Sequence, residues 1–472
     1  MTFDDRLLTQ TLAAVRAYQE GLPDRPVYPP ATREELHAAL GGPLPEEPVP
    51  AEQVIDELVK GADPGIVASS GPRYFGFVIG GTLPAALAAD WLTSNWDQNA
   101  AGYPSAPAGM VAEEIVSKWL RDLLGLPSTA SVGFVTGGAM ANFTSLAAAR
   151  FSVLERAGWD VEENGLAGAP PVRVLASEQA HFTISTATRL LGMGLKSVRP
   201  VPTDDQGRIL VDELRRVLDE DDGPTIVCAQ AGSIETGATD PLEEISTEAH
   251  ARDAWCHVDG AFGLWAAASP QLRDQLRGVE LADSWATDAH KWLNVPYDSG
   301  ICVIADPRAH RSATSLFVNA AYFPDPEADE RHGFEWVPEL SRRARGFTIY
   351  AALRSLGRRG VAELIEGCCA RAREMGDLLR DGDGVEILND VVLNQVLVRF
   401  HDDDAATWSV IDRVQREGTC WLGGTTFKGR AAMRVSICNW STTAADIERS
   451  AAAILAAADA ERPAAVAGRA TA

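Results

Sequence analysis

DSWATDAHKWLN, residues 283–294, places a lysine just after a short apolar run and between a histidine and a tryptophan. The run 283–288 has the length and character of a buried strand, so Lys291 is expected near the end of that strand. Lysine is seldom buried without a function. If its ammonium is desolvated among other cationic groups, its pKa falls, and the neutral amine can attack an aldehyde. A surface lysine in a loop would be the better interpretation if this His-Lys pair stood alone.

A second charged residue follows a buried strand upstream, in WCHVDGAFG (255–263). The carboxyl ends of strands form the ligand crevice of an open parallel sheet, so Asp259 is predicted to point into that crevice. A carboxylate there can form an ion pair with a pyridinium nitrogen, which makes the ring an electron sink. The small residues Gly260 and Ala261 let an aromatic plane approach the backbone. A helix N-cap is an equally good interpretation of Asp259 taken alone.

Two more segments have features of a ligand site. GFVTGGAMANFTSLAAAR (133–150) runs from a strand through a glycine pair into an Ala-rich helix, whose first N–H groups can hold a phosphate. It matches neither the Walker loop nor the dinucleotide-binding motif. His181 lies near the start of a helix, where its imidazole could stack on an aromatic cofactor. Because a lone histidine is more often structural, this assignment depends on the other segments.

Short β-rich runs alternate with helical stretches from about Pro72 to Arg345, which predicts crossover helices over a mostly parallel sheet. The predicted strands are 132–135, 172–177, 225–230, 255–259, 283–288 and 301–305. After Gly346 the pattern predicts a smaller α+β domain, with helices at 347–356 and 361–380, strands at 391–400 and 432–438, and a helix from about Ala444. We therefore divide the chain into a helical arm (1–70), a large cofactor-binding domain (71–345) and a small domain with an Ala-rich tail (346–472).

Composition excludes several classes of protein. A chain of 472 residues is too long for one core, and no apolar run is long enough to span a membrane. The net charge of −24 argues against nucleic acid or an anionic membrane as partner. The 7 cysteines are odd in number and form no Cys-x-x-Cys pair, which argues against a disulfide framework or a zinc site. The first residues are acidic where a secretory signal would be basic, so we do not expect export. We expect a cytoplasmic protein with reduced thiols and no metal site.

Taken together and in this order, TGGAMAN, EQAHF, HVDGAFG and DSWATDAHKW resemble the group II pyridoxal phosphate-dependent amino acid decarboxylases, which include the aromatic amino acid, glutamate and cysteine sulfinate decarboxylases. The resemblance extends from about Pro72 to Ala456. It implies an α/β fold of the aspartate aminotransferase type (PLP fold type I) and pyridoxal 5'-phosphate as cofactor. It also implies an obligate homodimer with the active site at the subunit interface.

The resemblance implies decarboxylation of an L-amino acid to its amine and carbon dioxide. Lys291 would hold the cofactor as a Schiff base, His181 would stack on the ring, and Asp259 would pair with the ring nitrogen, these three being the catalytic residues. Ala261 would pack against the other face of the ring. The remaining cofactor-binding residues are the phosphate-side Gly138, Ala139, Met140, Asp288 and His290, together with Ser233 and Thr236 of a strand-end turn. Asp288 stands where some members have asparagine.

The substrate pocket is implied in the same way. Its wall would be formed by Tyr74, Phe75, Phe77, Gln98, Asn99 and Tyr103. Arg434, in AMRVSIC, matches the arginine that meets the substrate carboxylate in relatives. Aromatic and polar residues together permit either aromatic or acidic substrates, so the substrate stays open.

One departure concerns the mobile loop. Relatives that act on aromatic amino acids have a tyrosine about nine residues before a pair of arginines, and it is thought to reprotonate the α-carbon. Counting back from Arg342 leads to Gly333, beside His332 and Phe334, so Tyr322 or His332 would have to serve instead. The missing tyrosine keeps an aldehyde-forming oxidative decarboxylase, an aminotransferase or a lyase open as alternatives, and a non-catalytic relative is a more remote one.

Overall fold

A seven-stranded mixed sheet forms the centre of the larger domain in the computed structural model, which describes residues 5–29, 31–314 and 330–462. The strand order is β1-β7-β6-β5-β4-β2-β3, and only β7 runs antiparallel to its neighbours. The strands are β1 (Ser131–Val135), β2 (Arg173–Ser177), β3 (Val198–Val201), β4 (Thr225–Gln230), β5 (Trp255–Asp259), β6 (Ser284–Asp288) and β7 (Gly300–Ile304).

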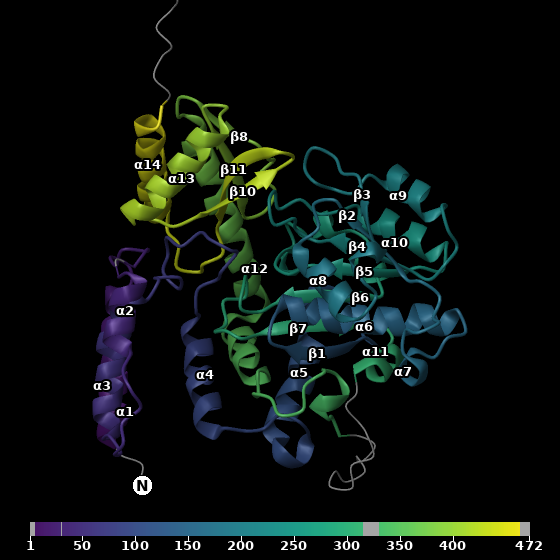
Figure 1. Cartoon of the computed structure of the whole chain (residues 1–472), viewed down its shortest axis with the longest axis horizontal. Coiled ribbons are helices and arrows are strands. Elements are labelled where there is room, and N and C mark those ends of the chain that lie inside the picture. The colour runs from purple at the N-terminus through teal and green to yellow at the C-terminus, as the bar shows by residue number, and fades with distance from the viewer. Residues whose placement is uncertain (1–4, 30, 315–329, 463–472) are drawn as a thin grey trace, which may run out of the picture.

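Helices cover both faces of this sheet (Figure 1). On one face α6 packs across β5, β6 and β7 and against α8 and α11. On the other face, α5, α9 and α10 contribute to the main hydrophobic core. The helices are α5 (Pro107–Leu124), α6 (Gly138–Arg156), α7 (Val161–Asn164), α8 (Phe182–Leu190), α9 (Val211–Leu218), α10 (Leu242–His250) and α11 (Pro307–Thr314). Because side chains alternate along a strand, His257 and Asp259 of β5 share the face covered by α6.

All six predicted strands of the larger domain are present, and β3 was missed. Its sequence VRPV contains a proline, which has no backbone N–H to donate. A strand at the edge of a sheet tolerates this loss, because one side of the strand has no partner strand. The predicted α/β fold of the aspartate aminotransferase type, with a large mostly parallel sheet and a smaller domain, is confirmed.

The smaller domain contains an antiparallel sheet of order β10-β11-β9-β8. Its strands are β8 (Val385–Ile387), β9 (Gln395–Phe400), β10 (Gly423–Phe427) and β11 (Arg430–Ser436), and its helices are α13 (Asp404–Glu417) and α14 (Ala444–Ala460). The strand expected from residue 391 begins only at Gln395. The long helix α12 (Gly346–Arg380) leads into this domain and breaks at Gly357, whose φ of 62° ends regular helix.

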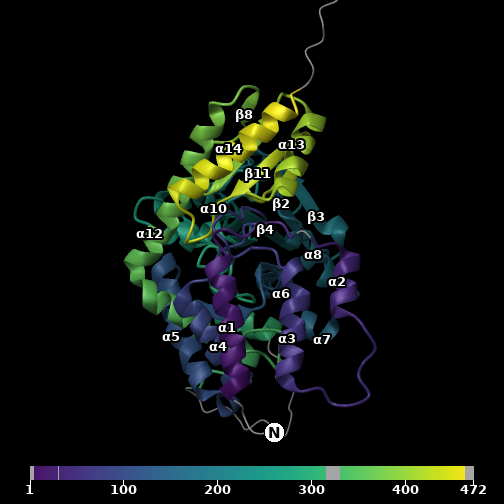
Figure 2. The same ribbon diagram turned by 90° about the vertical axis from the view of Figure 1, so that its left-hand side faces the viewer.

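The N-terminal helices stand beside the rest of the molecule (Figures 1 and 2). They are α1 (Asp5–Gly21), α2 (Arg33–Leu40) and α3 (Ala51–Ala62), and α4 (Pro84–Trp96) follows them. Gly61 is the one buried residue in the described parts of α1, α2 and α3. Among the described residues no helix is both long and apolar enough to cross a membrane.

Two fully buried histidines make stability depend on pH. Burial lowers the pKa of His310 to about 3 and that of His257 to about 4, so both are neutral in the folded chain. The unfolded chain takes up these protons as the pH falls below about 6.5, so the stability is complete above that pH and is lost below it. For His310 the loss amounts to about 2 kcal/mol by pH 5.

The expected result is that His310→Gln weakens the fall in stability between pH 7 and pH 5, measured as the urea midpoint of unfolding. The variant itself is less stable at pH 7, because Nε2 of His310 donates to the carbonyl oxygen of Trp336 at 2.9 Å. His37→Gln, at a largely exposed site of α2, is the control and should keep the wild-type pH dependence. An unchanged dependence in His310→Gln would contradict the prediction.

Candidate active site

Lys291 lies three residues beyond the end of β6 and forms an ion pair with the last residue of that strand. Its Nζ is 2.9 Å from Oδ2 of Asp288, whose side chain is buried. Burial alone would lower the pKa of Lys291, but the carboxylates of Asp288 and Asp259 together outweigh it and raise the pKa. The condition stated above for a lowered pKa, cationic groups around the amine, is not met in the single chain, where the carboxylates of Asp288 and Asp259 act on Lys291.

One small cavity brings four predicted residues together. His181, Asp259, Ala261 and Lys291 line it. The other lining residues are Val78, Gln230, Gly232, Ile234 and Phe262. Asp259 ends β5, and its partner in the neighbouring strand β4 is Gln230, so both side chains stand at the carboxyl edge of the sheet.

His181, the residue that precedes α8, is one of the residues that line this cavity. Its Nδ1 lies 2.8 Å from the hydroxyl oxygen of Thr183. Burial lowers the pKa of His181. His181 and Ala261 both line the cavity, and an imidazole beside a small side chain suits a flat aromatic ring.

The start of α6 forms a cradle beside Asp288 and His290. A Cβ at Gly138 would lie 2.7 Å from Oδ2 of Asp288, so the backbone approaches closely because the residue is glycine. Gly138, Ala139 and Met140 form the first turn of α6, where backbone N–H groups have no partner within the helix. Nδ1 of His290 accepts a hydrogen bond from the backbone N–H of Ser299 at 3.1 Å, which leaves the ring proton on Nε2, 3.5 Å from Oδ1 of Asp288.

Ser233 and Thr236 lie next to the cavity without lining it. The Ser233 hydroxyl bonds Glu235, and the Thr236 hydroxyl donates to the carbonyl oxygen of Gln206 at 2.7 Å. Their neighbours Gly232 and Ile234 line the cavity instead.

None of the seven predicted substrate residues lines the cavity within the single chain. Phe75 belongs to the hydrophobic core, while Tyr74 and Phe77 both contact the ring of Trp421. Arg434 is buried and interacts electrostatically with Glu235, and its positive charge acts on His181.

The other three substrate residues lie in the segment between α4 and α5. Gln98 and Asn99 are exposed, and the Asn99 side chain accepts a hydrogen bond from the backbone N–H of Arg342 at 3.2 Å. Tyr103 packs on the small cluster around Met110.

The loop residues singled out in the sequence fall partly outside the described residues. Tyr322 lies there. His332 is buried and its ring is 5.3 Å from that of Phe334. Gly333 is buried against Arg342, since a Cβ would lie 2.1 Å from a guanidinium nitrogen.

Several polar residues at the site were missed in the sequence. Gln230 could have been found, since it ends an apolar strand as Asp259 does. Asn142 and His257 were quoted within motifs but given no role, because a helix residue and a mid-strand residue show no sign in sequence that they meet. Asn142 Nδ2 donates to Oδ2 of Asp259 at 2.9 Å, and its Oδ1 lies 3.0 Å from Nε2 of His257.

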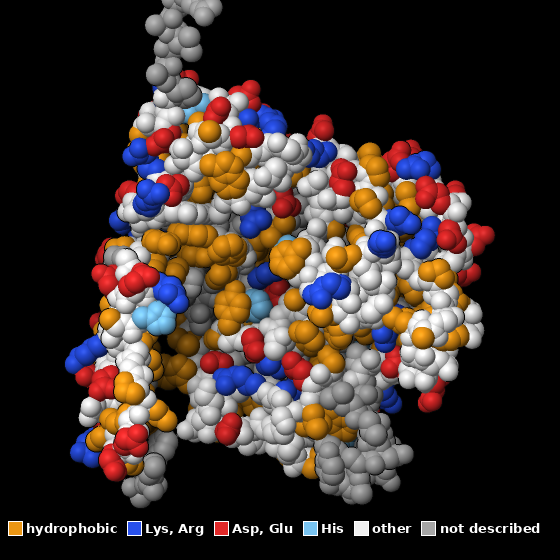
Figure 3. Space-filling view, in the orientation of Figure 1, with side chains coloured by type: hydrophobic (Ala, Val, Ile, Leu, Met, Phe, Trp, Pro, Cys, Tyr) orange, Lys and Arg blue, Asp and Glu red, His pale blue; other side chains and the backbone are white. Residues whose placement is uncertain are grey.

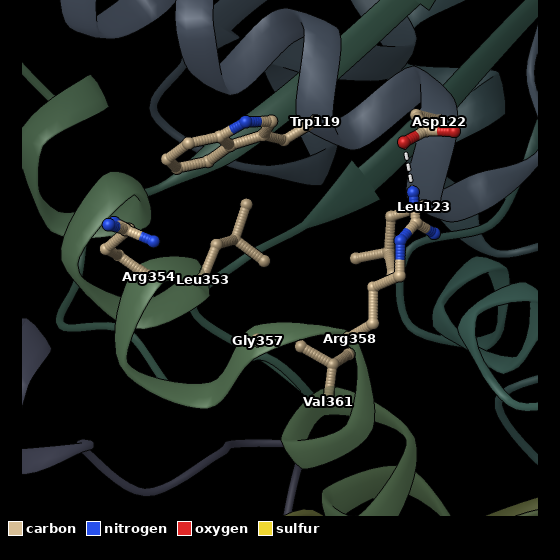
Figure 4. Close-up of a pocket in the computed structure, with 8 residues that line it drawn as sticks. All are labelled: Trp119, Asp122, Leu123, Leu353, Arg354, Gly357, Arg358 and Val361. Atoms are coloured by element: carbon tan, nitrogen blue, oxygen red, sulfur yellow. Dashed lines mark hydrogen bonds and ion pairs between the residues drawn. The ribbon is translucent and has the colours of Figure 1, made fainter.

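A second pocket, of about 330 Å³, lies at the break in α12, between α5 and α12 (Figure 4). Trp119 and Leu353 line it, and Arg358 forms an ion pair with Asp122 at its edge. It includes no predicted site residue, so the chemistry is assigned to the cavity at the sheet edge.

A half-buried lysine, a carboxylate and an imidazole line one small cavity, and a helix start lies nearby. These are the groups that an enzyme uses to hold pyridoxal phosphate. The family model described as the pyridoxal-dependent decarboxylase conserved domain matches residues 34–401. The chain belongs to this family, its cofactor is pyridoxal phosphate, and its general reaction is amino acid decarboxylation.

Curated relatives support the same assignment. The chain is 28% identical to tryptophan decarboxylase 1 of Oryza sativa subsp. japonica over 455 residues, which is 89% of this chain and 87% of the relative. It is also 28% identical to the aromatic-L-amino-acid decarboxylase of Bacillus atrophaeus, with 92% and 91% covered. The crystal structure of Oryza sativa TDC with PLP and tryptamine superimposes with a TM-score of 0.90 at 24% identity, covering 97% and 99% of the chains.

The residues present fit the cofactor. Oδ1 of Asp288 is buried and has no hydrogen-bond partner, so this carboxylate oxygen is left unsatisfied in the chain alone. Lys291 and the first turn of α6 lie beside that carboxylate, and Asp259 stands with His181 in the cavity. Within the described residues no group of three His, Cys, Asp or Glu side chains is placed to hold a metal ion.

Proposed function

We propose that this enzyme decarboxylates an L-amino acid to the corresponding amine and carbon dioxide, with the cofactor joined to Lys291 as a Schiff base. The observation that supports it best is the shared cavity of Lys291, Asp259, His181 and Ala261. When bound, the cofactor supplies an electron sink for charge that develops at the substrate α-carbon.

Each residue has a role that its surroundings permit. The Asp259 carboxylate, held by Asn142, is placed to keep a ring nitrogen protonated. His181 and Ala261, which both line the cavity, would pack against the ring. The first turn of α6 and His290 hold the phosphate, where N–H groups and the helix dipole favour an anion.

Arg434 binds the substrate carboxylate in this proposal. Its guanidinium is largely buried, and Glu235 is the carboxylate whose charge acts on it most strongly. By holding the substrate carboxylate, Arg434 would orient the substrate for the reaction, and such positioning accelerates catalysis.

The test has two parts. Borohydride reduction followed by peptide mapping should place the reduced cofactor adduct on Lys291. A panel of aromatic, acidic and basic L-amino acids should then give equal amounts of amine and carbon dioxide with one or more substrates. An adduct on another residue, or a keto acid without carbon dioxide, would overturn the proposal.

A second candidate is the oxidative reaction that releases an aldehyde. It is favoured by the residues at 332–334, where His332 and Phe334 lie near the expected position of a tyrosine proton donor. Assays for aldehyde and peroxide on the same substrate panel separate it from simple decarboxylation.

We also propose that the enzyme is a cytoplasmic homodimer. All seven cysteines are free and buried, as in a reducing compartment.

A groove between α1, α3 and α4 is lined mainly by apolar side chains, including Val15, Ile55 and Leu58. Hydrophobic side chains gather between the arm and the body (Figure 3). Such an exposed apolar surface is typical of an interface between subunits.

Leu58→Glu is therefore expected to shift the protein from dimer to monomer in analytical ultracentrifugation, because a charge would be buried in that interface. Leu58 is 53% exposed in the single chain. The control is Leu44→Glu, at a site that is 91% exposed and lies outside the groove. A dimer unaffected by Leu58→Glu would argue against this surface as the interface.

A further inference from the structure

A continuous chain of hydrogen bonds runs from β5 and β6 through α6 to Asp259. Trp255 Nε1 lies 2.9 Å from Oγ of Ser284, which lies 2.9 Å from Nδ1 of His257. Nε2 of His257 lies 3.0 Å from Oδ1 of Asn142, whose Nδ2 donates to Asp259 at 2.9 Å. His257, Asn142 and Ser284 are buried completely or nearly so.

The register of the sheet and the position of α6 create this chain. His257 and Ser284 are direct partners in the parallel pair of β5 and β6, so their side chains point to the same face. The helix α6 crosses that face and places Asn142 one turn from its start, between His257 and Asp259.

The groups at the two ends of this hydrogen-bond chain fix the direction of every hydrogen bond in it. An indole N–H only donates and an ionised carboxylate only accepts. Asn142 must therefore present its NH₂ to Asp259 and its carbonyl oxygen to His257. Burial keeps His257 neutral, with a pKa of about 4, so its single proton lies on Nε2 and Nδ1 accepts from Ser284.

Asn142 has a second branch that reaches His181. Its Nδ2 also donates to the Thr183 hydroxyl at 3.1 Å, and that oxygen lies 2.8 Å from Nδ1 of His181. Since the hydroxyl oxygen already accepts from Asn142, its own proton is free for Nδ1 of His181. One amide thereby holds both the carboxylate and the imidazole of the cavity.

We propose that Asn142, His257 and Ser284 are positioning residues that hold the Asp259 carboxylate oriented toward the ring nitrogen of the cofactor. All dipoles of the chain point their hydrogens toward Asp259, and such chains strengthen each bond within them. This inference rests on the proposed function, because the orientation of the Asp259 side chain matters for the reaction only when the cofactor is bound beside it.

The proton on His257 can be observed without the cofactor. Long-range ¹H–¹⁵N spectra of protein labelled at its histidine nitrogens should show Nε2–H at His257, assigned through the signal lost in His257→Gln. In Ser284→Ala the bond that fixes Nδ1 is lost, so a mixture of the two neutral forms is expected. Ser284→Thr restores the hydroxyl and should restore the single form. A proton on Nδ1, or on both nitrogens, in the wild type at neutral pH would overturn the proposal.

The second measurement is cofactor retention in the holoenzyme, followed by absorbance during dialysis. Asn142→Ala should release the cofactor about tenfold faster or more, because a hydrogen bond to a charged group is lost. Ser284→Ala should release it faster than Ser284→Thr does. The control is Ser145→Ala, which removes an equally buried hydroxyl of α6 that has no hydrogen-bond partner.

The two measurements separate the two proposals. Wild-type retention in Asn142→Ala and Ser284→Ala would end the inference while Lys291 still forms its adduct. If borohydride trapping found no adduct on Lys291, the proposed function would fail, while the His257 spectrum would still report the hydrogen-bond chain.

Discussion

Lys291→Ala is expected to lower turnover roughly 10⁴-fold and to leave no borohydride-reducible adduct at position 291. The reason is chemical, since alanine has no amine with which to bind the cofactor aldehyde. The variant also leaves Asp288 buried without its ion pair, because Nζ of Lys291 is 2.9 Å from that carboxylate. The measurements are product formation, the visible absorbance of protein purified with added cofactor, and the mass of the tryptic peptide that contains position 291.

Lys196→Ala removes an exposed lysine and is the matched control, expected to behave as the wild type. Lys291→Arg keeps a positive charge near Asp288 but forms no Schiff base, so it separates the ion pair from the covalent role. If Lys291→Arg kept wild-type turnover, the lysine would be structural.

The sequence predicts the site where chemistry follows the end of a strand, and it fails where two elements meet. Asp259 ends a predicted strand, and Lys291 and His181 each follow one, so the rule that ligands gather at the carboxyl ends of strands placed the three together. Gln230 obeys the same rule and was missed only because glutamine has no distinctive chemistry. Asn142 and Ser284 were not foreseeable, because their meeting at His257 depends on the register of β5 with β6 and on the position of α6.

The fold shows the same division. The fully buried strands β4 and β6, of six and five residues, were predicted to within a residue. The short strands β8 and β10 were missed, since β10 begins with two glycines and β8 has only three residues. Such strands form because a neighbouring strand offers hydrogen bonds: β10 pairs with β11, and β8 pairs with β9. The boundaries near residues 70 and 345 stay predictions.

Asp259→Asn is expected to lower turnover about 10²- to 10³-fold, as does the loss of one preorganised electrostatic contact in other active sites. Asparagine has nearly the same shape as aspartate but no charge, so it holds a protonated ring nitrogen poorly. It also weakens the hydrogen bond from the NH₂ of Asn142, which would face either another NH₂ or an uncharged carbonyl oxygen. The adduct on Lys291 should persist, in contrast to Lys291→Ala. Asp212→Asn, at an exposed carboxylate of α9, is the control and should leave turnover unchanged.

The hydrogen-bond chain makes a sharper prediction in this background. If Asn142 and Ser284 act through Asp259, then Ser284→Ala should change turnover less in Asp259→Asn than in the wild type, because no carboxylate remains to be held. A double-mutant cycle on turnover and on cofactor retention measures that coupling. Equal effects of Ser284→Ala in both backgrounds would show that Ser284 stabilises the fold rather than the charge, since residues that act through one another are not additive.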